Sequence, residues 1–322
     1  MTRLTTLLLF VILALASLAL GVMLGSVDLG MRQIAAALVH GPVDVSGQIV
    51  WQLRLPRVAS AFACGGLLAL SGVLLQALLR NPMADPYILG ISGGAAVGAL
   101  GAMLLGLSAA LINFAALGGA IATTVLVLAL GLLSRAHGVL SLLLTGIALS
   151  AGFGGIISLI LTLAPAAQLH SMLFWLMGDL SHSGNPAAAW LVLILVSTIS
   201  IILGATLNVL GLGEREAQAL GVKVRTLQIA LILLAAVATA TAVVEAGSIG
   251  FVGLVVPHLI RLSGVADHRW LLPMAVLAGG TLVSVADSLA RTIAAPIQLP
   301  VGILTTLIGV PVLIILLHRQ RL

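Results

Sequence analysis

The most constraining feature of this chain is its series of long, continuous apolar runs, which only short polar joints interrupt. Of its 322 residues, 14 are Lys or Arg and 9 are Asp or Glu, so 7% are charged. A water-soluble domain needs about a quarter of its residues charged, and a helix that crosses a bilayer needs about 20 apolar residues. The sequence therefore predicts an all-α polytopic membrane protein in the lipid bilayer, with residues 1–322 forming a single domain.

Ten membrane spans fit the apolar runs. Their predicted bounds are 4–25, 55–79, 87–107, 110–134, 138–164, 186–210, 226–246, 249–262, 271–290 and 300–318. The joints on one side of these spans hold ten basic residues: Arg3, Arg80, Arg135, Arg215, Lys223, Arg225, Arg261, Arg269, Arg319 and Arg321. The joints on the other side hold four, namely Arg32, Arg54, Arg57 and Arg291. Lys and Arg concentrate on the cytoplasmic side, so both termini are expected in the cytoplasm. This orientation requires an even number of spans and so includes the short eighth one.

Several kinds of chemistry find no support in the sequence. The single cysteine, Cys64, cannot form a disulfide framework or a cysteine metal cluster. The single lysine, Lys223, follows Val222, so the chain lacks the G-x-x-x-x-G-K-[ST] loop that cradles nucleotide phosphates. The net charge of +5 would suggest nucleic acid in a soluble protein, but here it sets orientation. We expect no cofactor, no metal, no nucleic-acid partner and no enzymatic activity, and any ATP must be hydrolysed by a partner.

Two polar clusters lie at the joints near the second and ninth spans. Pro56 in the LRLPR run at 53–57 suits a helix start, and Gly65 and Gly72 offer a face for close helix packing. Asp287 and Arg291 are four residues apart, which places them on one helix face. We therefore expect an ion pair between Asp287 and Arg291 at the membrane boundary.

The most charged joint lies between residues 211 and 225. Leu212, Glu216, Ala219 and Leu220 can form one short helix, and Gly221 is well placed as its C-terminal stop. Two interpretations are open at this point. The segment is either a solvated helix or a knob that docks into a groove on a soluble partner.

Four motifs in this order resemble the FecCD/BtuC family of permeases. They are LRLPR, the LSG-x(3)-Q-x(3)-RNP run at 70–82, GFVGLVVPHLIRL at 250–262, and AD-x(3)-R at 286–291 with the following LPVG. The resemblance covers about residues 50 to 322. Members of this family are the membrane subunits of ATP-binding-cassette importers for iron–siderophores, haem and cobalamin. Gln298 departs from the pattern, because members often carry Glu before this Leu-Pro pair.

The resemblance implies a BtuC-like fold and a set of partners. Such a subunit works as a homodimer in the bacterial inner membrane, with two cytoplasmic ATPase subunits and a periplasmic substrate-binding protein. The fifth span, Leu142 to Leu163, and the tenth span would line the path. Which of the metal chelates is carried stays open.

The resemblance also implies two sets of site residues. Arg54, Arg57 and Arg291 would dock carboxylates of the binding protein, or else anchor to lipid phosphates. The residues implied for ATPase coupling are Gly213, Glu214, Glu216, Ala217, Leu220 and Gly221.

Two other classes of protein compete with this interpretation. Gly90-Ile91-Ser92-Gly93 fits a G-x-S-G element and His258 lies on a later span, as in an intramembrane serine protease whose base must reach its nucleophile. An ion-driven carrier would need buried carboxylates in mid-span, whereas Glu245 and Asp287 fall near span ends. His258 could also carry a proton or bind a metal, although a structural role for a lone histidine is more common.

Overall fold

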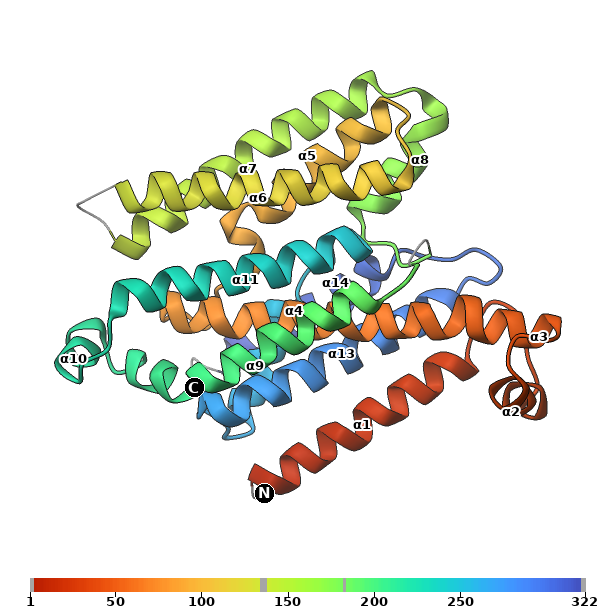
Figure 1. Cartoon of the computed structure of the whole chain (residues 1–322), viewed down its shortest axis with the longest axis horizontal. Helices are drawn as coiled ribbons and strands as arrows, with labels where there is room; N and C mark the ends of the chain where they lie inside the picture. Colours follow the sequence, from red (N-terminus) through yellow and green to blue (C-terminus); the bar gives the residue numbers. More distant parts are fainter. Residues whose placement is uncertain (1–2, 134–137, 182–183, 320–322) are drawn as a thin grey trace.

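The structure is a computed structural model that describes residues 3–133, 138–181 and 184–319. These ranges are helical almost throughout and contain no strand (Figure 1). In chain order the helices are α1 (Arg3–Met23), α2 (Met31–His40), α3 (Val45–Gln48), α4 (Leu55–Leu79), α5 (Ile91–Leu104), α6 (Ala109–Leu133), α7 (Gly138–Leu163), α8 (Ala166–Leu176), α9 (Ala187–Leu210), α10 (Glu214–Ala219), α11 (Val224–Ala246), α12 (Val252–Leu262), α13 (His268–Thr292) and α14 (Val301–Arg319). A π-helical turn, η1 (Ile49–Arg54), and a 3-10 turn, η2 (Pro86–Leu89), complete them.

The helices agree with the predicted set of ten spans. In the described ranges, seven helical stretches are long and apolar enough to cross a membrane by length and composition. Three shorter apolar helices, Ile91–Leu104, Val252–Leu262 and Val301–Ile315, fall at the third, eighth and tenth predicted spans. Arg135 and Arg321, which were counted for the orientation, lie outside the described residues.

Helix α4 is the centre of the bundle. Almost every residue of it is buried, and it packs most extensively against α13 and α11, with α12 and α9 completing its surroundings (Figure 1). A methyl group added to Gly65 would overlap the carbonyl of Gly279, and one added to Gly72 would overlap the carbonyl of Gly253. The predicted close-packing face is therefore confirmed. Small residues allow these backbones to approach closely.

The second span begins earlier than predicted. Helical structure runs without interruption from Val45 to Leu79, through α3, η1 and α4. Asp44 caps its start, because its side chain accepts a hydrogen bond from the Gly47 N–H at 2.7 Å. Pro56 has no N–H to donate, and directly before it the Leu55 N–H bonds to the carbonyl of Val50, five residues back. Pro56 therefore lies in the first turn of α4, as predicted, but the widened turn η1 continues the helix before it.

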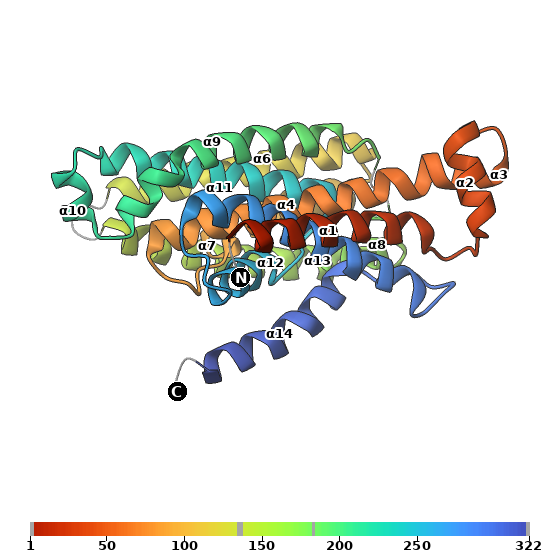
Figure 2. The same cartoon turned by 90° about the horizontal axis from the view of Figure 1, so that it is seen from below.

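The bundle has two distinct ends and a second group of helices along one side. Helices α2 and α3 lie at one end, while α10, the start of α1 and the end of α14 lie toward the other (Figures 1 and 2). Helices α5 to α8 form this group, which packs against α11 through α5 and α6 (Figure 1). Helix α14 leans away from the bundle (Figure 2).

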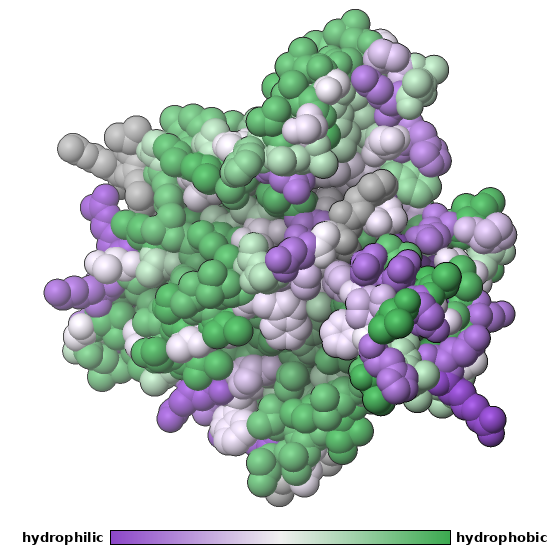
Figure 3. Space-filling view, turned by 45° about the vertical axis from the view of Figure 1, so that its right-hand side comes forward, coloured by the Kyte–Doolittle hydropathy of each residue, from purple (hydrophilic) through white to green (hydrophobic). Residues whose placement is uncertain are grey.

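The surface has the character of a membrane protein. Broad apolar areas cover it, and hydrophilic residues gather mainly toward the two ends (Figure 3). Large apolar side chains are exposed along α7, including Leu144, Leu159 and Leu163, and along α14, including Leu307 and Ile314. Since these two helices are the fifth and tenth spans, the helices implied to line the path are also among the least covered by the chain itself.

Candidate functional site

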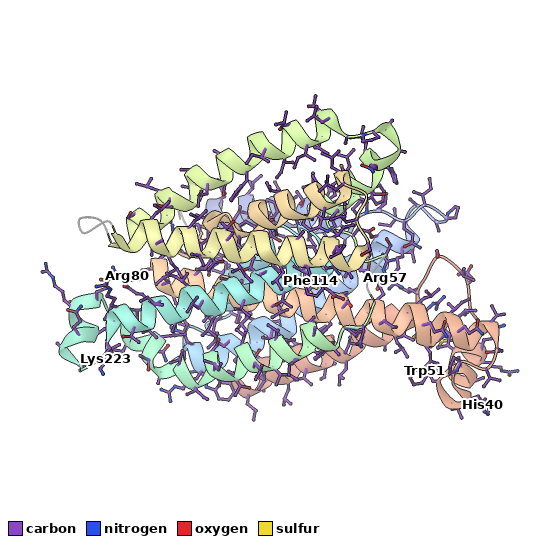
Figure 4. The ribbon with its side chains drawn as sticks, turned by 45° about the horizontal axis from the view of Figure 1, so that its top comes forward. His40, Trp51, Arg57, Arg80, Phe114 and Lys223 are labelled. Atoms are coloured by element: carbon purple, nitrogen blue, oxygen red, sulfur yellow. The ribbon has the colours of Figure 1, made fainter. Side chains whose placement is uncertain are left out.

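A buried cluster of three arginines and one aspartate lies toward the end that carries α2 and α3; Arg57 marks it in Figure 4. The Arg57 guanidinium donates to Asp287 Oδ1 from Nη2 at 2.8 Å and from Nε at 3.0 Å. The Arg291 Nε lies 3.0 Å from Asp287 Oδ2, so the predicted ion pair within α13 is confirmed. Asp287 has no exposed surface. One buried carboxylate therefore serves two guanidinium groups.

The same cluster closes the C-terminal end of α1. The last carbonyls of a helix have no partner within it, and guanidinium groups suit the negative end of the helix dipole. Arg54 Nη1 donates to the carbonyls of Val22 and Met23 at 2.8 Å each. Arg291 Nη2 donates to the carbonyl of Gly21 at 3.1 Å. The cluster thus joins α1 to α4 and α13.

The side chain of Gln298 completes the cluster from the loop before α14. Its Oε1 accepts a hydrogen bond from Arg57 Nη1 at 2.6 Å. A glutamate here, as the family pattern often has, would place a second carboxylate against Arg57. In this chain a neutral amide takes that place. The polar contact is therefore kept without the charge.

The structure corrects one assumption behind the docking prediction. Arg54, Arg57 and Arg291 are 4%, 8% and 4% exposed, and each has partners inside the chain. They are neither exposed ion-pairing groups nor arginines that reach for lipid phosphates. Docking of a binding protein at this end stays a prediction. Such docking would have to act through the electrostatic field of the arginine cluster or through a rearrangement of the cluster.

The predicted coupling segment lies at the other end of the bundle, where Figure 4 labels Arg80 and Lys223. Helix α10 is packed against α9 and α11, and Ala217 is its fully buried contact. Glu214 lies 3.4 Å from Arg80 Nη2, at the end of α4, and accepts from Gln228 at 3.2 Å. These contacts fix the small helix to the ends of two long ones.

The residues implied for coupling differ in their placement. Leu220, like its neighbour Leu212, is largely exposed, and Glu216 is exposed as well. Gly213 and Gly221 have φ values of +135° and +84°, so each suits glycine, and Gly221 follows the helix end as predicted. Ala217 instead points into the bundle. An arginine at that position would therefore disrupt the packing of α10 against α9 and α11.

A groove lies beside the junction of α11 and α12. Residues 247–250 have no helical structure, and they border this groove of about 370 Å³. The groove is lined by Leu176, Met177, Ser248, Gly250, Gly302, Ile303, Thr306 and Leu307. Its walls are mainly apolar, and its side-chain hydroxyls come from Ser248 and Thr306. The groove therefore offers a passing polar molecule few specific contacts.

The competing interpretations gain little from the structure. Ser92 Oγ lies 2.9 Å from Ser248 Oγ, which is a hydroxyl and not a general base. Asp287 is buried as an ion-driven carrier requires, but two guanidinium groups hold it. Among the described residues, no three His, Cys, Asp or Glu side chains lie together as a metal site would need.

Two polar side chains that hold breaks in the helical structure were not predicted from the sequence, namely the buried Gln76 and the partly buried Tyr87. Gln76 Nε2 donates to the carbonyls of Ala84, Gly253 and Leu254 at 3.3 Å each, and Arg261 bonds to Gln76 Oε1. Tyr87 bonds to both backbone groups of Ile249. The available signal was a polar side chain within or beside an apolar run, because such a group in a membrane needs a partner.

Comparisons with known proteins agree with this architecture. The hemin transport system permease protein HmuU of Yersinia pestis is 42% identical, over 97% of this chain and 95% of that protein. The vitamin B12 import system permease protein BtuC of Citrobacter koseri is 38% identical, over 84% of this chain and 83% of its own length. A solved structure, described as an inward-facing conformation of a transporter assigned to the metal-chelate ABC type, has a TM-score of 0.87 and 34% identity. That match covers 97% of this chain and 98% of the other.

A family profile gives the same result from sequence alone. The profile described as the FecCD transport family matches residues 9–319, which is nearly the whole chain. The relatives also match over most of their own length. This multi-pass membrane protein therefore belongs to the FecCD transport family.

Proposed function

We propose that this chain is the membrane permease subunit of an ATP-binding-cassette importer that carries a metal chelate across the bacterial inner membrane. The observation that carries the proposal is the match to permeases of hemin and vitamin B12 systems over most of both chains. The missing phosphate loop supports it, because the energy must then come from separate subunits. Two copies of the chain would enclose the path, with α7 and α14 facing it.

The coupling end of the bundle is proposed to bind the ATPase subunits in the cytoplasm. Arg215, Gln218 and Leu220 are exposed on α10 and beside it, while Ala217 anchors the helix to the bundle. A partner that moves α10 would act directly on α4 and α11, through Arg80 and Gln228. Both termini are proposed to lie on this side, which agrees with the excess of basic joints.

The arginine cluster is proposed to contribute to docking of a periplasmic binding protein at the opposite end. The cluster holds three guanidinium groups and one carboxylate, although Asp28 near Arg54 offsets part of the charge. A net positive field attracts carboxylates before contact. We expect Arg57→Gln to lower the affinity for loaded binding protein at low salt, and Arg57→Lys to retain it. Equal affinities for the two variants would remove Arg57 from docking.

Reconstitution tests the main proposal. The chain would be purified with its ATPase subunits, placed in vesicles, and supplied with binding protein loaded with haem, cobalamin or a ferric siderophore. We expect cargo to accumulate only with ATP and with both partners present. Accumulation driven by a proton gradient without ATPase subunits would support the carrier, and labelling of Ser92 by a fluorophosphonate would support the protease.

A matched pair of variants tests the coupling surface. Leu220→Asp places a charge on the exposed apolar position at the end of α10, and Val39→Asp makes the same kind of change on α2, where Val39 is 79% exposed. We expect Leu220→Asp to reduce co-purification of the ATPase subunits and Val39→Asp to leave it unchanged. If both variants retain the ATPase equally well, the segment is only a solvated helix.

A further inference from the structure

The interruption between α11 and α12 lies inside the membrane-spanning part of the bundle. Just before it, Glu245 accepts a hydrogen bond from Ser60 of α4 at 2.6 Å. Just after it, Gly253 meets Gly72, further along α4. The interrupted segment, residues 247–250, therefore lies between these two levels of α4. Backbone groups without helical partners are costly there, because lipid offers no hydrogen bonds.

The single tyrosine of the chain supplies those partners. Tyr87 Oη donates to the carbonyl of Ile249 at 2.8 Å and accepts from the Ile249 N–H at 2.9 Å. Ile249 is 1% exposed, so water does not replace these bonds. Tyr87 is itself held, since Asp85 Oδ1 accepts from its backbone N–H at 2.8 Å. One hydroxyl thus satisfies both backbone groups of a buried residue.

Helix α14 packs closely against the interrupted segment. A methyl group on Gly302 would overlap the carbonyl of Met177 and crowd that of Ser248, and one on Gly309 would crowd the side chain of Phe251. Phe251 has φ +68°, a rare conformation for a residue with a side chain. The groove lies at the same place, bordered by Ser248 and Gly250 on one side and by α14 on the other. The position of Ile249 therefore affects the shape of the groove.

A continuous series of contacts joins the coupling end to this segment. Glu214 of α10 pairs with Arg80, and the loop that follows Arg80 is bonded to Gln76 through the Ala84 carbonyl. Asp85 then leads into η2, whose first residues are Pro86, which packs on Gly253 of α12, and Tyr87. No long helix has to bend for a displacement of α10 to reach the segment. Such a series is a route for coupling only if a variant along it changes coupling.

We infer that Tyr87 is a positioning residue for transport, which holds the interrupted segment as the wall of the groove and links it to the coupling end. The inference rests on the proposed function. Loss of the hydroxyl would leave the Ile249 N–H and carbonyl buried without partners, and the segment would relax away from its position. ATP hydrolysis by the partner subunits would continue, but fewer hydrolysis events would move cargo.

The test compares Tyr87→Phe with the wild type in the full complex of permease, ATPase and binding protein. Leaving a buried backbone group unpaired shifts a conformational equilibrium by a factor on the order of ten. We therefore expect cargo moved per ATP to fall about tenfold, with ATP hydrolysis per complex changed less than about twofold. Hydrogen exchange should quicken in peptides that contain Ile249 and stay unchanged in α13. The control is Ser92→Ala, which removes the contact with Ser248 but leaves Ile249 paired and should resemble the wild type.

The outcomes separate the inference from its alternatives. Normal cargo per ATP in Tyr87→Phe overturns it, and so does a parallel fall of uptake and ATP hydrolysis, which would indicate a structural role alone. If Tyr87→Phe does not assemble, Asp85→Ala decides in its place, because it removes the acceptor that holds the Tyr87 backbone N–H and keeps the hydroxyl; an unchanged ratio there overturns the inference. Absence of ATP-driven uptake by the wild type would instead refute the proposed function, while hydrogen exchange at Ile249 would still report the Tyr87 contact.

Discussion

Replacing Asp287 by asparagine should destabilise the protein strongly, although the two side chains have nearly the same shape. Asp287 is fully buried and is the carboxylate between Arg57 and Arg291. Removing one partner of a buried ionic group leaves uncompensated charge, at a cost of about 3–5 kcal/mol. No cavity forms, so the loss is electrostatic. The matched control is Asp44→Asn, the same chemical change at an exposed helix cap, where asparagine caps as well as aspartate.

The assay is the midpoint of thermal inactivation in detergent, followed as the fraction of protein that still elutes as a defined oligomer. From the size dependence of melting temperatures, a loss of this magnitude lowers the midpoint on the order of 10 °C. Gln298→Glu provides a second test of the electrostatic account, because Gln298 Oε1 already lies 2.6 Å from Arg57 Nη1. The double variant Asp287→Asn with Gln298→Glu returns a charge to Arg57 but not to Arg291, so it should recover about half of the loss. A midpoint for Asp287→Asn equal to that of Asp44→Asn would refute the electrostatic account.

Three further predictions concern packing, coupling and pH. Gly72→Ala should cost about 1–3 kcal/mol through overpacking against α12, whereas Gly101→Ala, where an added methyl group meets nothing within 4 Å, should be neutral in the same thermal assay. Ala217→Arg should lower expression and thermal stability as well as ATPase binding, because the position is buried; normal stability would show that the residue faces a partner. The hydrogen bond from Asn208 and that from the Arg269 N–H hold the pKa of Asp267 below its usual range, so its stabilising effect is present above the unfolded pKa and is lost as pH falls through the folded one. Asn208→Ala should therefore shift the acid limb of a stability–pH curve to higher pH, and an unchanged limb would count against this contact.

The fold could be predicted from the sequence because membrane spans are encoded locally. Each apolar run of sufficient length must form its own backbone hydrogen bonds in lipid, so hydropathy alone places the ten helical segments. The start of the second span was different. Residues 45–54 contain Gln52 and Arg54 and look like a polar joint, but Asp44 caps a helix there and Val50 is fully buried. Polarity of a short stretch does not reveal whether it is solvated or packed.

The candidate sites could be predicted only where the partners are close in sequence. The spacing of four residues was enough for the pair of Asp287 and Arg291. Arg57 lies 230 residues from Asp287, so no local pattern connects them, and Arg57 was predicted to dock a partner or to anchor to lipid phosphates. The burial of Ala217 could not be predicted, for another reason. Helix α10 has six residues, which is under two turns. So short a helix has too few repeats of apolar residues to indicate which face is buried.

Three of the polar side chains inside the bundle share one physical role, and this suggests which parts can move. Gln76 and Tyr87 bond to backbone where the helical ladder is broken, and Arg54 bonds to the open end of α1. Polar groups are costly in lipid unless they are paired, and these three satisfy backbone groups that the helices leave unpaired. The broken segments are thus tied to α4 as one unit. By contrast, α7 and much of α14 expose apolar side chains and contribute none of these ties. Rearrangement during transport should therefore occur at α7 and α14, against a second copy, while the contacts around α4 are kept.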